Sequence, residues 1–309
     1  MSEPSLAHAD GALRLHDWGL ILAQGPEAAA FLNSQLTQQM LHLDAASARP
    51  AGYCSPKGRL LATFVAWQAA PETIALACSA DLLPATLKRL SMYVLRAKCK
   101  LTDGSAQWPL CGLAGPAAET LLAGSVAEAD WACGRHGDAW VIRLPAADGV
   151  ARCLWAGAEA PPLPALADEA WRWLEVRSGV PRIVAATVDR FVPQMLNLEL
   201  LGAVDFKKGC YPGQEVVARS QFRGTIKRRT YLMRGTAALA AGDEVFHSDD
   251  PEQPAGMVVL AASLPGGQHA ALVELKMAAL AGGSVHAGRA DGARLQPATL
   301  PYALDALSD

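Results

Sequence analysis

The pattern of apolar residues changes at Ile226, and this change limits the folds open to the chain. Downstream of it no stretch has convincing helical periodicity, and short apolar runs alternate with turns rich in glycine and proline. The runs with the length of β-strands are residues 226–233, 243–246, 256–262, 270–275 and 285–287. Short strands with such turns are typical of a small closed or nearly closed β-barrel. We therefore expect a domain boundary near Gly235 and a C-terminal barrel domain over residues 236–309.

Upstream of this point, runs with the length of strands are mixed with stretches of helical periodicity. Residues 13–23 predict one long strand or a strand pair, and Gly25-Pro26 opens a predicted helix through Leu36, because proline suits the first helical position. Next come a predicted hairpin (51–54 and 59–67), a strand (73–79) and a helix through Tyr93 that Asp81 is expected to cap. This order is typical of an α+β sandwich, since a parallel α/β sheet alternates strands and helices throughout.

A second α+β unit is predicted further along the chain. Its elements are a strand at 110–113, a helix at 116–122 and strands near 140–144. An Ala/Pro-rich connector at 156–166 leads to a helix over 168–177, which ends at Gly179 just before Pro181, as helix stops usually do.

Charge is distributed unevenly along the 309 residues. The whole chain has a net charge of -3, but residues 172–234 hold 12 basic and 5 acidic residues, a net charge of +7. The remainder has a net charge of -10, with 15 basic and 25 acidic residues. An anionic partner at one region of an acidic surface is the interpretation that this asymmetry favours. The 51% hydrophobic and 18% charged content excludes a disordered chain.

The N-terminus and the cysteines predict a cytoplasmic protein. Residues 1–11 contain Glu3 and Asp10 without a basic patch, and no apolar core follows, so we expect no secretory signal. The longest uncharged run, 253–273, is broken by proline and glycine, so we expect no membrane span. Seven cysteines without C-x-x-C spacing predict neither a disulfide framework nor a tightly held metal. Six of them, all except Cys210, are expected to be small buried hydrophobes.

A dense polar loop, Lys208-Gly209-Cys210-Tyr211-Pro212-Gly213-Gln214-Glu215, separates two apolar stretches. Its two glycines allow positive φ angles and close backbone approach, and a helix is predicted from Glu215 through Gln221. Cys210 therefore precedes a helix N-terminus beside Lys207 and Lys208, and both effects favour thiolate over thiol. A tight turn that joins two domains and merely tolerates a cysteine explains the same residues, and these physical features leave both interpretations open.

The string K-G-C-Y-x-G-Q-E-x-x-A-R over residues 208–219 resembles the signature of the YgfZ family of folate-binding proteins, relatives of the glycine cleavage T protein, an aminomethyltransferase. Other segments resemble that family too: LHDW at 15–18, FLNSQLT at 31–37, AGYCSPKGR at 51–59, RSGVP at 177–181 and FVPQ at 191–194. With the barrel-like C-terminus, the resemblance covers nearly the whole chain.

The resemblance implies a three-part cloverleaf of α+β class around a central channel that admits tetrahydrofolate or a derivative of it. Residues 1–235 would form a folate-binding, aminomethyltransferase-like region of two intertwined α+β (ferredoxin-like) units, and residues 236–309 the barrel. The two tryptophans that contact folate in the family fall by position on Trp18 and Trp171, and an indole offers a stacking face to a pterin or aminobenzoyl ring.

The resemblance also implies roles for the basic residues and for the loop. Candidates to meet the glutamate tail of a folate are Arg177, Lys207, Lys208, Arg219, Arg223, Lys227, Arg228 and Arg229. Cys210 and Lys208 are the expected functional pair, and the signature loop comprises Gly209, Tyr211, Gly213, Gln214, Glu215 and Arg219. A plain solvated basic face is the alternative for part of this set.

One departure separates the chain from the aminomethyltransferases. Their hairpin resembles G-G-x-x-D-D, whereas this chain has Leu61 and Ala62 where carboxylates are expected, and neither side chain can supply that charge. The family then implies an auxiliary role, with folate and iron–sulfur client enzymes, some of them modifying tRNA, as partners. A lone cysteine cannot hold an iron–sulfur cluster, which normally takes four thiolates, so any contact with a cluster must be shared or transient.

Two alternatives remain at this point, and whether the chain is an enzyme is left open. One is an active folate-dependent aminomethyltransferase or demethylase with a substitute acid such as Asp44 or Glu199. The other is an RNA-binding module that uses the basic stretch. No RNP, KH or zinc-finger string supports it and few aromatic residues interleave with the basic ones, so we expect no direct binding of nucleic acid.

Overall fold

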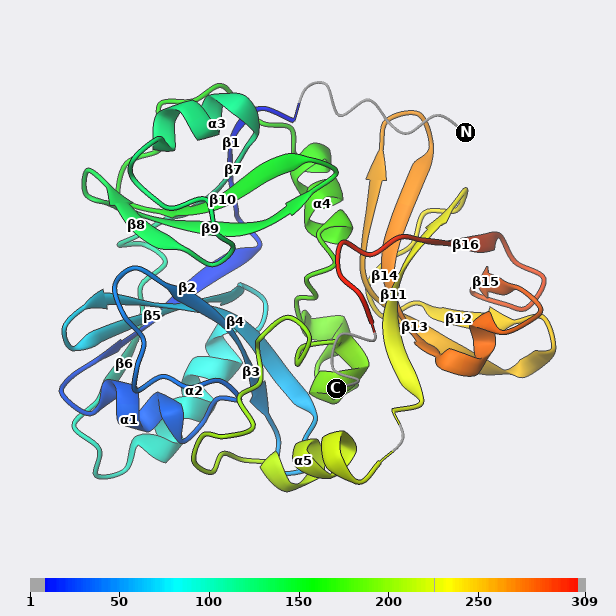
Figure 1. Cartoon of the computed structure of the whole chain (residues 1–309), viewed down its shortest axis with the longest axis horizontal. Helices are drawn as coiled ribbons and strands as arrows, with labels where there is room; N and C mark the ends of the chain where they lie inside the picture. The colour runs from blue at the N-terminus through cyan, green and yellow to red at the C-terminus, as the bar shows by residue number, and fades with distance from the viewer. Residues whose placement is uncertain (1–8, 225, 305–309) are drawn as a thin grey trace.

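The computed structural model describes residues 9–224 and 226–304, so most of the stretch on which the signal prediction rests, Glu3 included, lies outside the described residues. Figure 1 shows two β-sheets stacked on one side of the molecule, a barrel on the other side, and helix α4 (Asp168–Arg177) between them. Two α+β units followed by a closed barrel are the predicted architecture, and the predicted fold class is confirmed.

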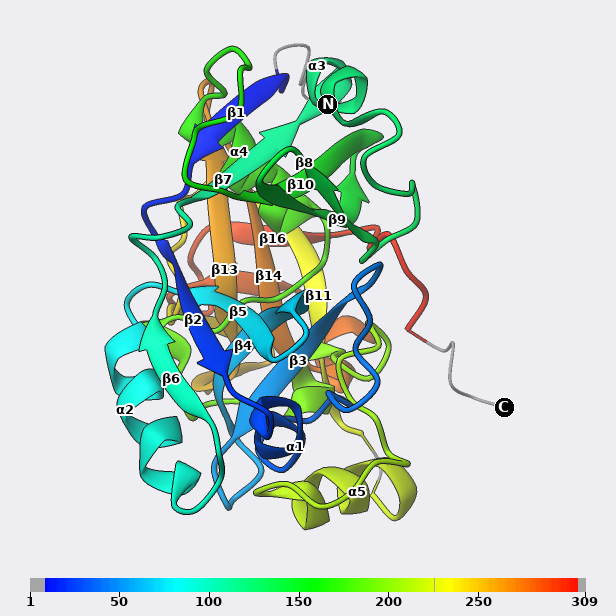
Figure 2. The same ribbon diagram turned by 90° about the vertical axis from the view of Figure 1, so that its left-hand side faces the viewer.

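The first sheet has the strand order β3-β4-β5-β2-β6, and all its neighbouring strands are antiparallel. The predicted hairpin is present as β3 and β4, and the predicted strand over residues 73–79 is β5. The strands are β2 (Trp18–Gln24), β3 (Ala48–Cys54), β4 (Leu60–Ala70), β5 (Thr73–Ser79) and β6 (Lys100–Asp103). Helices α1 (Ala28–Asn33) and α2 (Leu83–Val94) cover its outer face (Figure 2).

The second sheet has the order β1-β7-β10-β9-β8, again with antiparallel neighbours. Its strands are β1 (Gly11–Arg14), β7 (Leu110–Ala114), β8 (Cys133–His136), β9 (Ala139–Ala147) and β10 (Val150–Ala156). Helix α3 (Gly115–Leu122) packs on its outer face. Residues 13–23, predicted as one long strand or a strand pair, belong to two strands that lie in different sheets, because β1 pairs with β7 and β2 pairs with β5. Strand β1 therefore precedes the first unit in the sequence but belongs to the sheet of the second unit, so the two units are intertwined.

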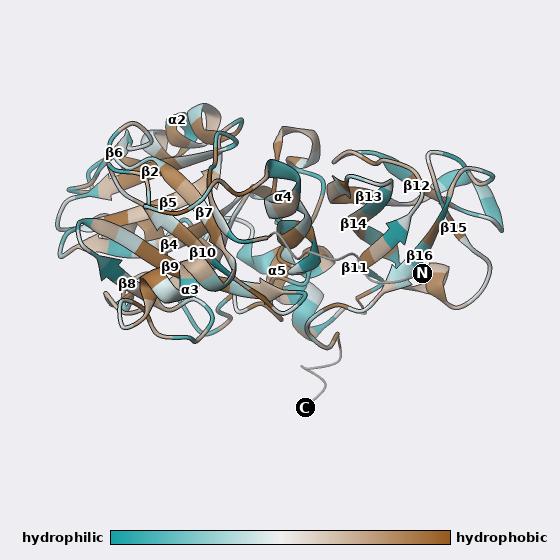
Figure 3. Ribbon diagram, turned by 90° about the horizontal axis from the view of Figure 1, so that it is seen from above, coloured by the Kyte–Doolittle hydropathy of each residue, from teal (hydrophilic) through white to brown (hydrophobic). Residues whose placement is uncertain are grey.

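The two sheets face each other across one hydrophobic core. Leu20, Leu22 and Trp67 of the first sheet meet Ile142 and Leu154 of the second. Side chains alternate along a strand, so the residues between these positions point outward and pack on the helices. The layers are therefore α1 and α2, first sheet, second sheet, α3. Figure 3 shows hydrophobic segments recurring along the strands of both sheets, as this two-sided burial requires.

Helix α4 links the sheets to the barrel. It has acidic residues in its first turn and Arg177 in its last, which suits the helix macrodipole. Trp171 and Leu174 pack into the core between the sheets, whereas Trp173 and Val176 pack with residues of the barrel strands. Both faces of the helix are therefore buried.

The barrel is closed in the order β11-β14-β13-β12-β15-β16. Its strands are β11 (Arg228–Gly235), β12 (Glu244–His247), β13 (Asp250–Leu264), β14 (Gln268–Lys276), β15 (Val285–Ala287) and β16 (Arg294–Ala298). Sequence analysis missed β16, whose residues lack an apolar run, and β16 closes the barrel against β11. Gly235 ends the first barrel strand, and the division into residues 1–235 and 236–309 stays a prediction.

Two local predictions in the first unit were wrong. Helix α1 is shorter than the predicted helix through Leu36, since the carbonyls of Asn33 and Leu36 accept hydrogen bonds from Lys208 Nζ instead of continuing a helical ladder. Asp81 does not cap α2, because Leu82 occupies the N-cap position and Asp81 Oδ2 accepts a hydrogen bond from the Ala185 amide at 2.8 Å.

Loops and short helical segments connect these elements, and the stretch between α4 and the next α-helix, residues 178–213, is long and contains no strand. The short helical segments include the 3-10 turns η1 (Ala185–Thr187), η2 (Pro193–Leu196) and η3 (Met277–Leu280), and helix α5 (Gln214–Phe222). Among the helices described for residues 9–224 and 226–304, none has the length and apolar character needed to cross a membrane.

Candidate functional site

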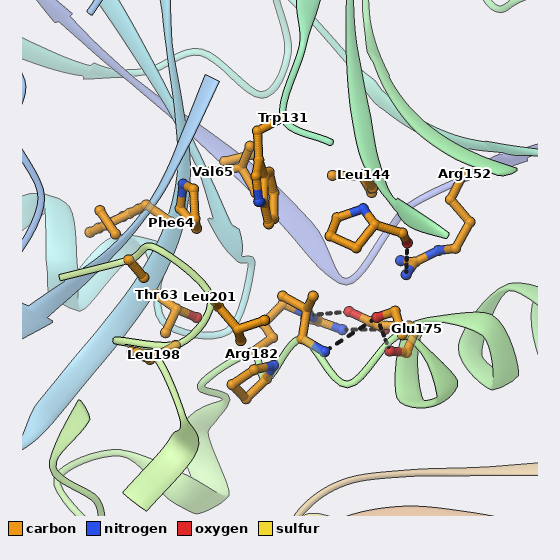
Figure 4. Close-up of a pocket in the computed structure, with 18 of the residues that line it drawn as sticks. Thr63, Phe64, Val65, Trp131, Leu144, Arg152, Glu175, Arg182, Leu198 and Leu201 are labelled. Atoms are coloured by element: carbon orange, nitrogen blue, oxygen red, sulfur yellow. Dashed lines mark hydrogen bonds and ion pairs between the residues drawn. The ribbon is translucent and has the colours of Figure 1, made fainter. Parts of the chain in front are cut away.

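A cavity opens between the two sheets at the C-terminal end of α4, and we call it the inter-sheet cavity (Figure 4). Together with the open solvent at its mouth, it comprises about 610 Å³ of space not filled by atoms, of which the enclosed part is small. Its lining comes from stretches that lie far apart in the sequence: the start of β2, strands β3, β4 and β5, Trp131, strands β9 and β10, the α4 terminus with residues 178–182, and residues 198–203. The site exists only once these distant segments have packed together.

An ion-pair network forms one wall of the inter-sheet cavity. Arg182 Nε donates to Glu175 Oε1 at 2.8 Å, and its Nη2 donates to Asp17 Oδ2 at 2.8 Å. The Arg182 guanidinium also lies 4.8 Å from the centre of the Trp18 ring. Burial raises the pKa of Asp17, but Arg182 and Arg172 outweigh this effect and hold that pKa below its ordinary value. The network is therefore charged and fixes the indole of Trp18 at the cavity.

A second arginine, Arg152 of β10, lines the cavity without such a partner. It is 3% exposed, and its described hydrogen bond is one from Nη1 to the carbonyl of Pro145 at 3.4 Å. Its Nε is buried and finds no hydrogen-bond acceptor among the described residues. The guanidinium lies 4.9 Å from the centre of the Trp171 ring, and burial lowers the pKa of Arg152 to about 10. Such a group remains charged at neutral pH but is poorly hydrogen-bonded.

Trp18 and Trp131 contribute aromatic surface to the lining. Trp131 has a φ of 64°, a left-handed conformation that bulky residues rarely adopt. Backbone hydrogen bonds hold it there: its amide donates to the Arg143 carbonyl at 2.9 Å, and its carbonyl accepts from the Ala48 amide at 2.7 Å. Strained residues of this kind cluster at functional sites.

The structure does not bring Trp171 to the inter-sheet cavity. Its side chain is 1% exposed and packs in the core, where Gly112 leaves room for it: a Cβ at Gly112 would lie 2.6 Å from the ring. Arg152 lies against its face and is the residue that reaches the cavity. Arg177 is also placed elsewhere, since its Nε donates to both Asp148 oxygens, at 2.8 and 2.9 Å. Of the tryptophan pair predicted for folate, Trp18 alone lines the cavity.

The signature loop over residues 208–215 packs against the turn of the β3–β4 hairpin. Gly213 has a φ of 80°, and a Cβ there would lie 2.7 Å from the Gly58 Cα. Here the predicted need for glycine is confirmed. At Gly209 that prediction was wrong, because its φ is not positive and a Cβ would meet nothing within 4 Å among the described residues. The loop therefore packs the start of α5 onto the hairpin of the first unit.

Lys208 is a buried anchor of this loop. Its Nζ donates to the carbonyl of Asn33 and, at 2.8 Å, to that of Leu36, and it lies 4.8 Å from the centre of the Tyr211 ring. Burial lowers the pKa of Lys208 to about 8. Burial raises the pKa of Tyr211, so for both residues it disfavours the charged form. Both side chains are thus used for packing the loop onto the first unit.

Cys210 is exposed, whereas Cys54, Cys78, Cys111, Cys133 and Cys153 are buried and Cys99 is half-buried. Burial raises the pKa of Cys54, Cys78 and Cys133 to about 12. Cys210 is absent from the lining residues described for the inter-sheet cavity, as is the rest of the signature loop. The exposed thiol and the cavity are therefore two separate features of the surface.

The remaining predicted site residues lie on or near α5. Glu215 and Arg219 form an exposed ion pair at 3.2 Å, one helical turn apart, while Gln214 opens the helix and Arg223 follows its end, also exposed. A second hollow, lined in part by Arg219, Lys227 and Arg228, lies between α5 and β11.

Most of the arginines behind the local charge of +7 are neutralised within the chain. Arg172, Arg177 and Arg182 pair with Asp17, Asp148, Asp168 or Glu175, and Arg228 and Arg229 pair with Glu274 and Glu199. The charge excess of this segment is thus largely structural. It is a weaker argument for an anionic ligand than the sequence indicated.

Glu199 and Asp44, the candidate substitutes for the missing transferase carboxylate, do not line the inter-sheet cavity. Glu199 is buried against Arg229; burial raises its pKa, and the arginine opposes that rise. Asp44 is exposed and accepts hydrogen bonds from the Ser47 hydroxyl and the Ala46 amide, both at 2.9 Å. Of the described lining residues, Glu175 is the only carboxylate, and both its oxygens accept from Arg182.

Sequence reasoning missed Trp131, Arg152, Glu175 and Arg182 as site residues. For Arg152 a signal was present, since Arg152, Leu154 and Ala156 share one face of a strand whose other face is also apolar. A charged residue on a two-sided buried strand requires an explanation. Trp131 carries no local signal, because its place at the cavity depends on long-range packing.

Comparison with solved structures defines the class to which this fold belongs. The chain is similar to the crystal structure of glycine cleavage system aminomethyltransferase T from Bartonella henselae, with a TM-score of 0.72, 17% identity and coverage of 97% of this chain and 88% of that chain. At this identity the likeness shows the fold alone, an aminomethyltransferase-type fold. Heterotetrameric sarcosine oxidase from Corynebacterium sp. U-96 matches over 47% of the chain with a TM-score of 0.32, which supports no argument.

The sequence comparison narrows this class to a family. The tRNA-modifying protein YgfZ of Serratia proteamaculans (strain 568) is 31% identical over 270 residues, which cover 82% of this chain and 81% of that protein. The chain belongs to the YgfZ family, as its signature loop predicts. No family model matches the chain.

Proposed function

We propose that this chain is a folate-binding auxiliary protein that takes a tetrahydrofolate in the inter-sheet cavity. The observation that carries the proposal is the lining itself, where the indoles of Trp18 and Trp131 stand beside the guanidinium groups of Arg152 and Arg182. Flat aromatic side chains suit a pterin or aminobenzoyl ring, and poorly satisfied donors suit a ligand rich in acceptors. When bound, a tetrahydrofolate supplies a carrier for one-carbon units.

The proposed process is the modification of tRNA, which is the role in the name of the Serratia relative. We extend it to the maintenance of iron–sulfur enzymes that serve such modification, because that is the role implied by the signature string. The chain would act on protein clients and contact no nucleic acid directly. Within residues 9–224 and 226–304, no group of three or more His, Cys, Asp and Glu side chains could hold a metal ion.

Cys210 is proposed as the reactive group of this auxiliary role. Its exposure and its place ahead of α5 leave the thiol accessible to a client protein. Since the cavity lining described here does not include it, the thiol would meet a client at the surface and not a one-carbon unit at the folate. Lys208 would then support the thiol by anchoring the loop that carries it.

A folate-dependent aminomethyltransferase is the weaker candidate. General acid or base work in the inter-sheet cavity needs a titratable group free to exchange a proton, and Glu175 is held on both oxygens by Arg182. Leu61 and Ala62 add no carboxylate to β4. We therefore expect no measurable methylene transfer from an aminomethylated lipoyl carrier to tetrahydrofolate, and turnover comparable to a glycine cleavage T protein would reverse this choice.

The folate proposal is tested by titrating the purified chain with tetrahydrofolate and its 5-formyl and methylene forms. We expect dissociation constants in the micromolar range. Trp18→Leu should weaken binding about tenfold, since stacking contributes ~0.5–1.5 kcal/mol beyond burial. Trp108→Leu is the matched control, because Trp108 is also half-buried against the same core but does not belong to the described lining. Equal effects of the two substitutions would refute the cavity assignment.

The cellular role needs a separate experiment. A strain lacking the chain is complemented with the wild type, Cys210→Ser or Cys99→Ser, and the activity of iron–sulfur enzymes is measured. We expect partial loss of that activity with Cys210→Ser and full complementation with the half-buried control, at equal protein levels. Full complementation by Cys210→Ser would make the cysteine a passenger in a structural loop.

A further inference from the structure

Arg152 has more hydrogen-bonding capacity than the folded chain uses. A guanidinium carries five N–H donors, and only the 3.4 Å bond to Pro145 is described for this one. Its neighbour Arg143 on β9, 8% exposed, offers a contrast, because it pairs with Glu119 at 3.5 Å and lies outside the described lining. Nine-tenths burial without an ion-pair partner costs free energy, which the contact with the Trp171 ring and one long hydrogen bond offset only in part.

The charges around the inter-sheet cavity compensate Arg152 only in part. Glu175, the only carboxylate of the described lining, favours the charged form of Arg152 through its own charge, but both of its oxygens accept hydrogen bonds from Arg182. Asp17, which also pairs with Arg182, is shared with Arg172. The ionisable groups that line the cavity, two arginines and one glutamate, therefore sum to a net positive charge.

The surroundings of Arg152 restrict the shape of what it can meet. The face of Trp171 holds the guanidinium from one side. In Figure 4, Leu144 lies next to Arg152, Trp131 lies further along the cavity, and Phe64 lies at the far side. A planar group fits between aromatic and aliphatic walls, and an acid group on it can accept hydrogen bonds from a guanidinium at close range.

From this geometry we infer that Arg152 is the specificity-determining residue of the inter-sheet cavity and receives a carboxylate of a ligand that also carries a flat aromatic ring. The aminobenzoyl-glutamate half of a folate is a ligand of that chemistry. The inference rests on the proposed function for the identity of the ligand, but the role of Arg152 is a property of the cavity. Trp171, assigned to folate contact by sequence position, would act indirectly by holding the guanidinium in place.

The experiment compares an acid and a neutral ligand by calorimetric titration of the full chain. The probes are 4-aminobenzoyl-glutamate, which is anionic, and 6-methyltetrahydropterin, which carries no net charge at neutral pH. We expect Arg152→Gln to weaken binding of the acid about 10- to 100-fold, the size of a charge-assisted hydrogen bond, and to leave the pterin within about twofold. Arg143→Gln is the matched control and should change neither. If Arg152→Gln fails to fold, Arg152→Lys, which keeps the charge, should bind the acid more tightly than Arg152→Met does.

A stability measurement separates binding from structure. Arg152→Met keeps the packing against Trp171 and removes the unpaired charge, so its midpoint of thermal unfolding without ligand should equal or exceed that of the wild type. A lower midpoint together with equal loss of both probes would overturn the inference, as would a wild type that binds the acid no better than the pterin. Binding of the acid through Arg152 without any binding of 5-formyltetrahydrofolate would instead refute the proposed function and leave the role of Arg152 standing.

Discussion

Two tryptophans predicted for the same task have different environments in the folded chain. Trp18 lines the inter-sheet cavity beside Arg182, whereas Trp171 fills the core behind Arg152. The resemblance to the family predicts that both residues contact folate. Their burial differs, however, because Trp18 lies at the cavity and Trp171 lies behind it in the core. The distinction can be measured, because a lining residue affects affinity and a core residue affects stability.

We predict that Trp171→Ala lowers the free energy of unfolding by ~3–5 kcal/mol, as removal of a fully buried aromatic side chain usually does. Trp18→Ala should cost less stability, since that side chain is only partly buried. Urea unfolding followed by circular dichroism measures both. A Trp171→Ala variant as stable as the wild type would contradict the packing described here.

Cys210 should be the first of the seven cysteines to react in the native protein, because the other six are buried or half-buried. Iodoacetamide labelling read by mass spectrometry should modify Cys210 before Cys99, and the five buried thiols only on unfolding. Cys210→Ser should leave the midpoint of unfolding unchanged. Labelling of any buried cysteine ahead of Cys210 would count against its proposed role.

At the scale of elements, the signature loop behaves as a joint between the β3–β4 hairpin and α5. Its glycines differ in what they do: Gly213 has a left-handed backbone against Gly58, whereas Gly209 faces open space among the described residues. We predict that Gly213→Ala destabilises the fold by roughly 1–3 kcal/mol and that Gly209→Ala is tolerated. Chemical denaturation of the pair tests this, and equal costs would show that the loop is not packed as described.

Lys208, which anchors the same loop, makes the free energy of unfolding depend on pH. Burial lowers its pKa to about 8 in the folded chain, against 10.5 for the ordinary side chain. Between these values the unfolded chain holds a proton that the folded chain has released, so this residue makes stability rise with pH from 8 to 10.5. Below that window both states are protonated, and the burial of the charge is a constant cost.

The measurement is the difference in unfolding free energy between the wild type and Lys208→Met across that window. We expect the wild type to gain on the variant by up to about 3 kcal/mol as pH rises. Lys207→Met, an exposed neighbour, is the control and should show no such gain. A difference that is flat with pH would mean that Lys208 is not buried.

Local sequence predicted most elements because their signals are local. The hairpin turn, the strand at 73–79, the helix at 168–177 and the strand at 285–287 rest on residues within each segment. The failures depend on distant partners. The backbone carbonyls at the end of α1 accept hydrogen bonds from Lys208, and the Asp81 carboxylate accepts one from the Ala185 amide. Strand β16 forms because it pairs with β11 and so closes the barrel.

At the scale of the whole molecule, the inter-sheet cavity is a product of assembly. The interleaving of β1 into the second sheet and the burial of both faces of α4 bring stretches from many parts of the chain to one opening. Motif reasoning found the signature loop, whose residues are contiguous. It did not find Arg152 and Trp131, whose roles arise only after folding. The strongest sequence motif and the inter-sheet cavity are therefore in different places.

The central claim, that a folate binds in the inter-sheet cavity, is tested most directly by amide hydrogen exchange with and without 5-formyltetrahydrofolate. Bound ligand should slow exchange in strand β4, in residues 178–182 and in residues 198–203, which together surround the opening. Helix α5 and the signature loop should exchange at unchanged rates. Protection confined to α5 and the loop around Cys210, or no protection at saturating ligand, would contradict the account.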